Sequence, residues 1–324
     1  MSVANASRPQ QARAPIRTEH APMRLAHHAQ MVLLAAVWGA SFLFLRLAAP
    51  TVGPIAVAAF RVTLAALVLL PFALRFALRR AQWQQLKDLW PTLLVSGLLS
   101  CVLPFMGLSQ AARAMPAGML SILNATSPLW GALVGWLWIG EKLSGWRAIG
   151  LGLGFGGVAW LSLTHTPLDG HTPWAAVCLA LGSTLMYGIA VHHSKRHLSA
   201  LPPVVVTTGC LVAASAVLMG PALWLGPQPM AGLSSGTPHA WSAVPASVWG
   251  ALAGLAVLCT AWAYLLFFKL IGEIGPSRAL TVTFLIPIFG MLWGWLFLHE
   301  SVSWDMLVCT AIIVTGTQLS NRAG

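Results

Sequence analysis

One stretch of seventeen residues occurs twice in the chain and constrains the fold more than any other feature. From Pro128 the sequence reads PLWGALVGWLWIGEKLS, and from Pro287, 159 residues later, it reads PIFGMLWGWLFLHESVS. Eight of the seventeen aligned positions are identical, which is hard to obtain by chance even in sequence rich in Leu and Gly. The chain is therefore expected to contain two copies of one unit, and such a repeat decides the fold question before other signals are weighed.

The composition is that of a membrane protein with several spans. Hydrophobic residues make up 57% of the 324 residues and charged residues only 8%, whereas about a quarter of a soluble protein is charged. A helix needs about 20 apolar residues to cross the hydrocarbon core. Ten segments approach that length, near residues 29–48, 54–74, 89–110, 116–140, 146–164, 174–193, 203–224, 246–268, 276–298 and 304–320.

The positive charges predict the orientation of these ten spans. With the amino terminus in the cytoplasm, fifteen of the 18 Lys and Arg residues fall in the tails and loops of that side. The opposite side holds only Arg113, and Arg46 and Arg61 lie within spans. Because cytoplasmic loops collect Lys and Arg, both termini are expected to be cytoplasmic, in a multi-pass protein of the cell inner membrane.

An odd number of spans in each unit inverts the second copy. Five spans per unit make the second unit enter the membrane from the opposite side, and the loop charges agree. The sequence predicts an all-α polytopic membrane protein of ten transmembrane helices in two inverted five-helix repeats, residues 29–165 and 174–320, after a disordered basic cytoplasmic tail of residues 1–28. Such repeats form a site between them near the bilayer midplane.

A second, weaker correspondence joins the starts of the two units. At an offset of 149 residues it pairs Trp38-Gly39 with Tyr187-Gly188, Arg46 with Lys195 and Pro54 with Pro203. Trp38 and Tyr187 would then be equivalent aromatic walls of a pocket, able to stack on rings or cations. The alternative is ordinary packing or an interface anchor, which is the commoner role of one Trp among 16.

The repeated prolines predict equivalent kinks. Pro128 and Pro287 each remove one helical hydrogen bond and leave the carbonyl four residues earlier without its donor. Those carbonyls belong to Asn124 and Thr283, which are themselves repeat equivalents. They would either face substrate in a central cavity or be satisfied by a neighbouring helix, and the sequence leaves both alternatives open.

Arg61 is the ionisable residue that most suggests a binding site. It lies seven residues into the second span from Pro54, about 10 Å along the helix axis. A charge at that depth is costly and indicates function, and a guanidinium suits a substrate carboxylate. The alternative is that Arg61 binds helix-end carbonyls and holds helices together. Arg46, nearer the outer end of its span, is expected to extend to the interface.

Glu141 and Glu300 end the fourth and ninth spans at equivalent positions on opposite sides of the membrane. They would gate the cavity or pass protons, or be solvated or paired, for example with Lys142 or Arg147. No Asp or Glu lies near the middle of any span. The sequence therefore does not support proton transfer through a buried carboxylate, which is the usual relay.

Three other patterns predict no site. His192, His193 and His197 lie among Lys195 and Arg196, where positive charge opposes a metal, so a solvated basic loop is expected. The five cysteines show no C-x-x-C spacing, which argues against disulfides and zinc. The G-x-G-x-x-G pattern in GLGFGG, residues 152–157, lies inside an apolar helix without the strand and acidic residue of a dinucleotide site. Its glycines suit close helix packing.

Taken together, WGASFLFLRLAAPTVGPIAVAAFRVTLAALVLLPF and the repeated Pro…Gly…Gly-Trp…Glu pattern resemble the EamA-like family of the drug/metabolite transporter superfamily. The resemblance extends from about residue 31 to residue 320, and its most specific parts are Trp38-Gly39, Phe60-Arg61, Glu141 and Glu300. It implies a central cavity lined by spans one to four and six to nine, peripheral fifth and tenth helices, and export of small metabolites such as amino acids.

The function expected from these patterns is secondary transport of small metabolites across the inner membrane by alternating access. An uncoupled facilitator or channel for small organic solutes is the alternative. An intramembrane enzyme is disfavoured because no span supplies a catalytic constellation. The expected partners are the lipid bilayer and a small, carboxylate-bearing substrate, with no nucleic acid, no cofactor and no metal, in a monomer or homodimer.

Overall fold

The computed structural model of the chain describes residues 23–79, 83–165, 174–230 and 240–320. These residues form helices and connecting loops, with no strand among them. The first helix already begins at Leu25, four residues before the expected boundary at residue 29. Residues 1–22 of the expected disordered tail and the expected loop at residues 166–173 lie outside the described residues.

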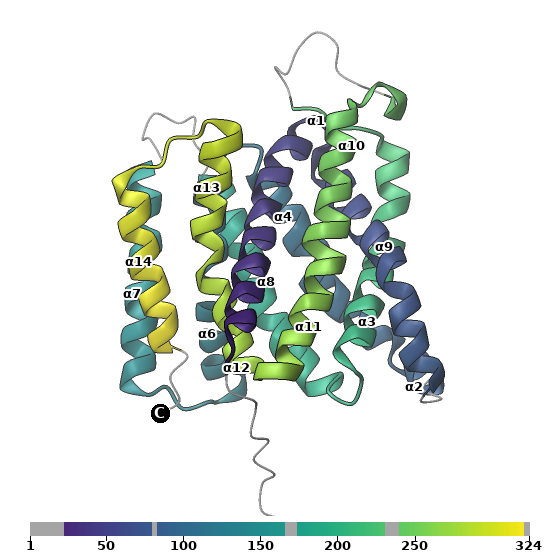
Figure 1. Cartoon of the computed structure of the whole chain (residues 1–324), viewed down its shortest axis with the longest axis horizontal. Helices are drawn as coiled ribbons and strands as arrows, with labels where there is room; N and C mark the ends of the chain where they lie inside the picture. The colour runs from purple at the N-terminus through teal and green to yellow at the C-terminus, as the bar shows by residue number, and fades with distance from the viewer. Residues whose placement is uncertain (1–22, 80–82, 166–173, 231–239, 321–324) are drawn as a thin grey trace, which may run out of the picture.

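Figure 1 shows the arrangement of the helices. The π-helical segments are η1 and η3, and the 3₁₀ segments are η2 and η4. In chain order the elements are α1 (Leu25–Arg79), α2 (Trp83–Asp88), α3 (Trp90–Gly97), η1 (Leu98–Val102), α4 (Leu103–Ala111), α5 (Ala117–Asn124), α6 (Ser127–Ile139), α7 (Gly145–His165), α8 (Trp174–His197), α9 (Pro203–Leu225), η2 (Trp241–Ala243), α10 (Ala246–Ala253), η3 (Gly254–Trp262), α11 (Ala263–Ile274), α12 (Pro276–Ala279), η4 (Leu280–Phe284), α13 (Ile286–Leu298) and α14 (Trp304–Ser320).

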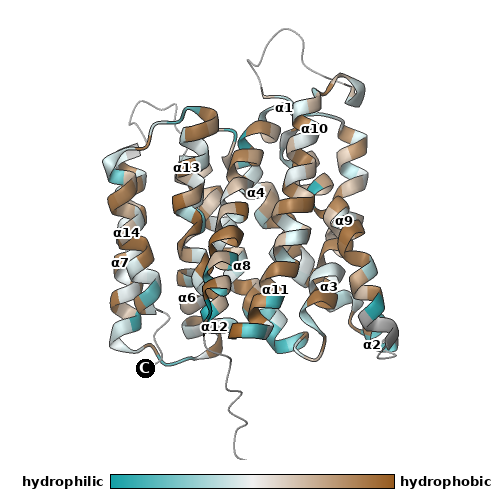
Figure 2. Cartoon of the chain, viewed as in Figure 1, coloured by the Kyte–Doolittle hydropathy of each residue, from teal (hydrophilic) through white to brown (hydrophobic). Residues whose placement is uncertain are grey.

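Apolar residues cover most of the length of these helices. In the described ranges six helical stretches are long and apolar enough to cross a membrane: Leu25–Arg75, Trp90–Ala111, Ala117–Ile139, Trp174–His197, Pro203–Leu225 and Ala246–Ile274. The first contains two of the expected spans, joined at a kink. Figure 2 shows hydrophobic residues along the bundle and hydrophilic residues gathered near α2, α12 and the end of α11. The architecture is therefore that of a multi-pass membrane protein.

The kink in α1 has a local cause. Pro54 has no N–H, so the carbonyl of Pro50 loses its helical donor. The backbone N–H of Met230, in the segment after α9, donates to that carbonyl at 2.8 Å, and the N–H of Gln228 donates to the carbonyl of Val52 at 3.1 Å. Gly53, which directly precedes Pro54, has φ 83°, a conformation that favours glycine. The segment after α9 thus replaces the missing hydrogen bond and fixes the turn between the two limbs of α1.

The spans that contain Pro128 and Pro287 are broken rather than bent. α5 ends at Asn124 and α6 begins at Ser127, so Pro128 lies in the first turn of a new helix. In the same way η4 ends at Phe284, and Pro287 lies in the first turn of α13. This differs from the expected mid-helix kink. The physical reason is that proline fits the first helical turn, where its missing N–H costs nothing.

Two of the four glycines of GLGFGG pack closely against other helices, Gly154 against α6 and Gly157 against α14, whereas a Cβ on Gly152 or Gly156 would meet nothing within 4 Å. A Cβ on Gly150 would come within 2.5 Å of the Gly316 carbonyl and of the Ser320 nitrogen, and Gly157 faces Ile313. Residue numbers rise along α7 as they fall along α14, so the two helices run antiparallel, side by side at one edge of the bundle (Figure 1). Small residues allow this close backbone approach.

Two further glycine contacts join equivalent helices from opposite halves of the chain. A Cβ on Gly39 of α1 would lie 3.0 Å from the backbone nitrogen of Gly290 in α13. A Cβ on Gly188 of α8 would lie 2.9 Å from the backbone nitrogen of Gly131 in α6. Gly39 and Gly188 are the 149-residue equivalents, and Gly290 and Gly131 are the 159-residue equivalents. One contact is therefore made twice, each time between a helix of one half and a helix of the other.

We expect Gly188→Ala to destabilise the protein by about 1–3 kcal/mol, because the added methyl must displace the backbone of α6. Gly182→Ala is the matched control, since it lies on the same helix and its Cβ would meet no heavy atom within 4 Å. The measurement is the midpoint of thermal unfolding of each purified variant in detergent. Equal midpoints for the two variants would contradict the importance of this contact.

Candidate functional site

Arg61 is buried in the bundle between helices of both halves. Its side chain is on the second limb of α1, with 8% of the residue exposed. The Nε atom donates a hydrogen bond of 3.0 Å to Oγ1 of Thr260 in η3, and the guanidinium carbon lies 3.8 Å from the ring centroid of Phe105 in α4. Within the described part of the chain no carboxylate forms an ion pair with Arg61. The guanidinium is thus positioned by neutral groups.

The π-helical segments explain how these partners reach Arg61. In η3 the hydroxyl of Thr260 donates to the carbonyl of Leu255, five residues earlier, at 2.8 Å. The equivalent part of the first half, 159 residues earlier, is η1, which is also π-helical. Phe105 and Tyr264 are equivalents by the same offset. Widened helical turns of this kind are frequent at functional sites, and here both halves contribute one beside the same cation.

Aromatic residues extend from Arg61 toward the α1–α11 interface. Phe105, whose ring contacts Arg61, and Tyr187 of α8 pack in the same part of the hydrophobic core. Tyr187 and Trp38 both pack against the other part. The ring of Tyr264 in α11 lies 6.4 Å from that of Trp38, and Trp38 lies 5.2 Å from Phe267. We call the predicted residues Arg61, Tyr187 and Trp38, with Phe105 and Tyr264, the aromatic–cationic cluster.

Tyr187 also has a central position in the packing. The described hydrophobic core forms two clusters, one around the first limb of α1 with α13 and one around the second limb of α1 with α9. Tyr187 is half-buried and packs against both. The cluster around Arg61 is thus close to the boundary between the two parts of the core.

Among the described residues, no hydrogen bond joins Asn124 or Thr283 to this cluster. The Asn124 carbonyl accepts a hydrogen bond of 2.7 Å from the Ser127 hydroxyl, so a side chain of the chain itself already binds the group expected to face substrate. The Thr283 hydroxyl donates to the carbonyl of Leu280 at 2.8 Å. Of the two alternatives, satisfaction within the protein is the one the structure has at Asn124, because Ser127 follows the helix break and can fold back.

Glu300 joins three elements at one end of the bundle. We call this the α13 end, where α13 ends and α14 begins, and the opposite end, where α6 ends and α7 begins, the α6 end (Figure 1). One carboxylate oxygen of Glu300 accepts a hydrogen bond of 3.1 Å from Nε of Arg46 in α1. The other accepts one of 2.8 Å from the backbone N–H of Ala117, the first residue of α5. Arg46 also donates to the carbonyl of Ala112 at 2.9 Å.

Glu141 occupies the equivalent position at the α6 end with a different partner. Gly140 and His299, which precede the two glutamates, both have positive φ, 76° and 53°. The backbone N–H of each glutamate donates to the glycine six residues earlier at 3.1 Å. Within the described residues Glu141 pairs with its sequence neighbour Arg147 at 3.4 Å, and not with Lys195, the equivalent of Arg46. The side chain of Glu141 is 39% exposed and that of Glu300 12%.

The packing against α13, the helix that precedes Glu300, is tighter than the packing against its equivalent α6, which precedes Glu141. A Cβ on Gly290, four residues after the start of α13, would collide with the hydroxyl of Ser121 in α5, whereas a Cβ on its equivalent Gly131 would meet nothing within 4 Å. α5 packs along α13. The corresponding helices, α6 with α12 and η4, are not in extensive contact in the described part of the chain. The α13 end is therefore closed between the halves, and the α6 end is looser.

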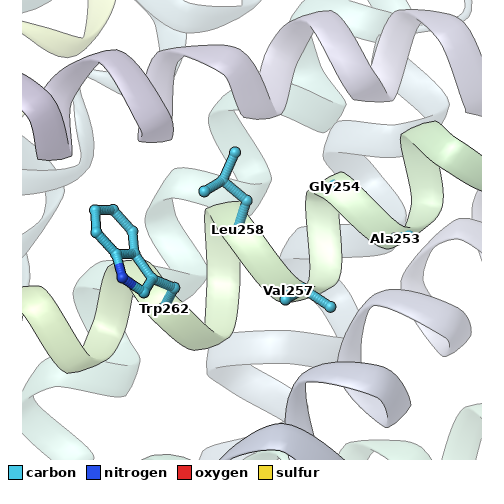
Figure 3. Close-up of a pocket in the computed structure, with 5 residues that line it drawn as sticks. All are labelled: Ala253, Gly254, Val257, Leu258 and Trp262. Carbon is cyan, nitrogen blue, oxygen red and sulfur yellow. The ribbon is translucent and has the colours of Figure 1, made fainter.

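Two apolar grooves lie elsewhere. One, of about 510 Å³, is lined by Ala253, Gly254, Val257, Leu258 and Trp262 of α10 and η3 (Figure 3). The other, of about 990 Å³, lies between α13 and α14, with Leu292, Trp295 and Leu307 among its lining residues. Neither includes Arg61 or another predicted site residue. Exposed apolar side chains such as Trp295 and Leu258 are those expected on a surface in contact with lipid.

Two of the histidines near the end of α8, His193 and His197, lie against each other with ring centroids 4.6 Å apart, and His192 has other partners. His193 shares a hydrogen bond of 2.9 Å with the hydroxyl of Ser96, and His197 is exposed. His192 is not in a solvated loop, contrary to expectation, because its ring enters the α6–α8 interface and donates to the carbonyl of Gly131 at 2.8 Å. Gly135 leaves room for it, since a Cβ there would lie 3.2 Å from Cε1 of the ring. In the described ranges no group of three or more His, Cys, Asp or Glu side chains could hold a metal ion.

Sequence comparison identifies the family. Residues 28–163 and 174–322 match the EamA-like transporter family. The chain belongs to the EamA-like transporter family. It is thus a membrane transporter and not an enzyme.

The relatives agree with this family. The chain is 30% identical over 292 residues to a protein of Bacillus subtilis (strain 168) named uncharacterized transporter YvbV, with 90% of each chain covered. A second uncharacterized transporter of that strain, YoaV, is 21% identical over 90% of this chain and 97% of its own. A solved crystal structure of a protein 18% identical in sequence superposes with a TM-score of 0.61, and the match covers 92% of this chain and 98% of the other. That protein shares the fold.

The difference between the two glutamates gives a prediction for stability. We expect Glu300→Gln to destabilise the protein by about 2 kcal/mol, because a partly buried carboxylate loses charge-assisted hydrogen bonds to two elements. Glu141→Gln removes an exposed pair and is expected to cost at most about 1 kcal/mol. Chemical or thermal unfolding of the two purified variants makes the comparison. The interpretation is wrong if Glu141→Gln is the more damaging change.

Proposed function

We propose that this EamA-like transporter is a secondary carrier of small metabolites, such as amino acids, across the cell inner membrane by alternating access. The observation that carries the proposal is the difference between the two ends of the bundle. Glu300 and Glu141 are equivalent residues, yet one is held between α1, α5 and α13 while the other pairs with a sequence neighbour. An exchange of these two arrangements would close one end and open the other.

The proposed topology has ten crossings in two inverted five-helix repeats, residues 29–165 and 174–320. Two observations support it. The glycine contact between the halves occurs twice, at equivalent positions. The equivalent helices α6 and α13 end on opposite sides of the bundle. α1 begins and α14 ends at the α6 end (Figure 1). Lys87 of α2 and Lys269 of α11 are on elements that reach the same end. This grouping favours the α6 end as the cytoplasmic one, with both termini there.

In this proposal Glu141 and Glu300 are the gating residues, and the structure corresponds to a state closed toward the outside. The two gates are unequal. Ala117 offers Glu300 a backbone N–H, but its equivalent 159 residues later is Pro276, which has none. The inner gate, with Glu141 and Lys195 as the equivalent pair, therefore lacks one of the three hydrogen bonds of the outer gate. The state closed to the outside is expected to be the more populated one without substrate.

Arg61 is the proposed binding group for the substrate carboxylate, with Trp38 and Tyr187 as aromatic walls. A cation at this depth costs about 2.5–3.5 kcal/mol or more, and no carboxylate among the described residues pairs with it. A ligand carboxylate would complete the site, because guanidinium and carboxylate form two parallel hydrogen bonds. Asn124 and Thr283 would lie beside the path rather than bind the ligand.

An uncoupled facilitator or channel for small organic solutes is the second candidate. The contacts of Arg46 and Ala117 with Glu300 favour the carrier, because they close one end of the bundle while the equivalent residues leave the other end looser. Flux in proteoliposomes separates the two. A carrier gives saturable counterflow of a labelled amino acid driven by unlabelled amino acid inside. A channel gives flux that rises in proportion to concentration and shows no counterflow.

The role of Arg61 is tested with matched substrates. We expect Arg61→Gln to raise the KM for amino acids by at least about tenfold, equivalent to about 1.4 kcal/mol, and to leave transport of the corresponding amino acid amides nearly unchanged. Arg75→Gln is the control, since Arg75 is an exposed residue of the same helix. Equal transport of amino acids by Arg61→Gln and wild type would contradict the binding role.

A further inference from the structure

His192 has one ring nitrogen bonded and the other buried without a partner. Its Nε2 lies 2.8 Å from the Gly131 carbonyl, which can only accept a hydrogen bond. Nε2 therefore carries the proton in the neutral ring, and Nδ1 presents a lone pair. Nδ1 is buried and has no hydrogen-bond partner. A buried polar atom left in this way needs a physical explanation.

A carboxylate lies next to this ring. A Cβ on Gly135 would be 3.2 Å from both Cε1 of His192 and an oxygen of Glu141. Cε1, which is the ring atom next to Nδ1, and the carboxylate of Glu141 therefore border the same small space beside α6. The absence of a side chain at Gly135 creates that space.

The second half of the chain has no such nitrogen at the equivalent site. The residue 149 positions before His192 is Leu43, and there Glu300 is paired instead with Arg46. One half thus holds its gating glutamate with a permanent cation from α1. The other half has, on the equivalent helix α8, a side chain that becomes a cation only on protonation.

We propose that Nδ1 of His192 is a proton-binding site that couples transport to the proton gradient, with Glu141 as the partner of the protonated ring. The proton comes from the water at the α6 end and adds to the lone pair of Nδ1, with no other bond broken. The imidazolium then donates from Nδ1 to Glu141 and links α8 to the end of α6. This inference rests on the proposed carrier function and names the ion that would drive it.

The other charged groups near this site leave Glu141 as the partner. Of the elements packed against α8, η1 contributes only the Cys101 thiol, and α3, α4, α5 and α6 contain no ionisable side chain. Beyond α6, Arg147 already pairs with Glu141 and would compete with the imidazolium for it. On α8 itself the other ionisable groups are Cys178, Tyr187, His193, Lys195, Arg196 and His197, and His193 contacts Ser96 instead.

The first measurement detects the proton directly and does not depend on transport. In wild-type protein labelled with ¹⁵N-histidine, the signal that disappears in His192→Gln is assigned to His192. As the pH is lowered, we expect its Nδ1 to change from a bare to a protonated nitrogen while Nε2 stays protonated. If Nδ1 stays bare at every pH at which the protein remains folded, the proposal is wrong. His192→Leu, the residue at the equivalent position, supplies the assignment if the Gln variant does not fold.

The second measurement separates coupling from transport. We expect His192→Gln to retain saturable counterflow within about twofold of wild type but to lose the gradient-driven accumulation, which for one coupled proton reaches about tenfold per pH unit. His193→Gln, the neighbouring control, should keep both. Accumulation unchanged in His192→Gln would overturn this proposal and leave the carrier function standing. Saturable counterflow absent from wild type, with a normal Nδ1 titration, would instead contradict the carrier function.

Discussion

The carboxylate of Glu300 is the interaction on which the arrangement of the α13 end depends. It accepts hydrogen bonds from Arg46 of α1 and from the first residue of α5. The backbone N–H of Glu300 donates to the carbonyl of Gly294 near the end of α13. Three helices from both halves of the chain thus meet at one side chain that is 12% exposed. Removing charge from such a site weakens the hydrogen bonds of its buried donors, which is why we expect a large effect from this one residue. The closed end follows from it, and so does the contrast with Glu141.

In the proposed mechanism, equivalent residues in different surroundings allow two states that differ in which end of the bundle is closed. The glycine contacts Gly39–Gly290 and Gly188–Gly131 are the same at both sites, so they act as a constant part of the interface between the halves. The contacts around Glu300 and Glu141 differ, so these are the part that can change. A carrier needs both a fixed axis and two gates that alternate. Pro276 at the position equivalent to Ala117 makes the gates unequal in strength, and His192 makes one of them sensitive to protons in our proposal.

The sequence predicted the membrane class and the EamA-like family, because the apolar runs and the repeated Pro–Gly–Gly-Trp–Glu pattern depend on spacing alone. It also selected Arg61, Trp38 and Tyr187, which the structure brings into one cluster. The sequence did not reveal Thr260 and Phe105 as partners of Arg61, since they are distant in the chain and ordinary in type. The equivalent π-helical segments η1 and η3 would have indicated this part of the bundle. A widened helical turn cannot be recognised from the types of residue that form it. The sequence left open whether the Asn124 carbonyl faces substrate, because the hydrogen bond from Ser127 depends on the helix break. His192 was placed in a solvated loop because its contact with Gly131 is long-range.

The most direct test of alternating access is to measure distances at both ends of the same molecule. Spin labels at Ala114 and Ser301 report on the α13 end, and labels at their 159-residue equivalents, Glu273 and Lys142, report on the α6 end. Pulsed electron resonance in lipid nanodiscs compares a cysteine-free background with the same background carrying Glu300→Gln. The account predicts that the variant lengthens the first distance and shortens the second. Lengthening at the α13 end with no change at the α6 end, or movement of both ends in the same direction, would contradict it.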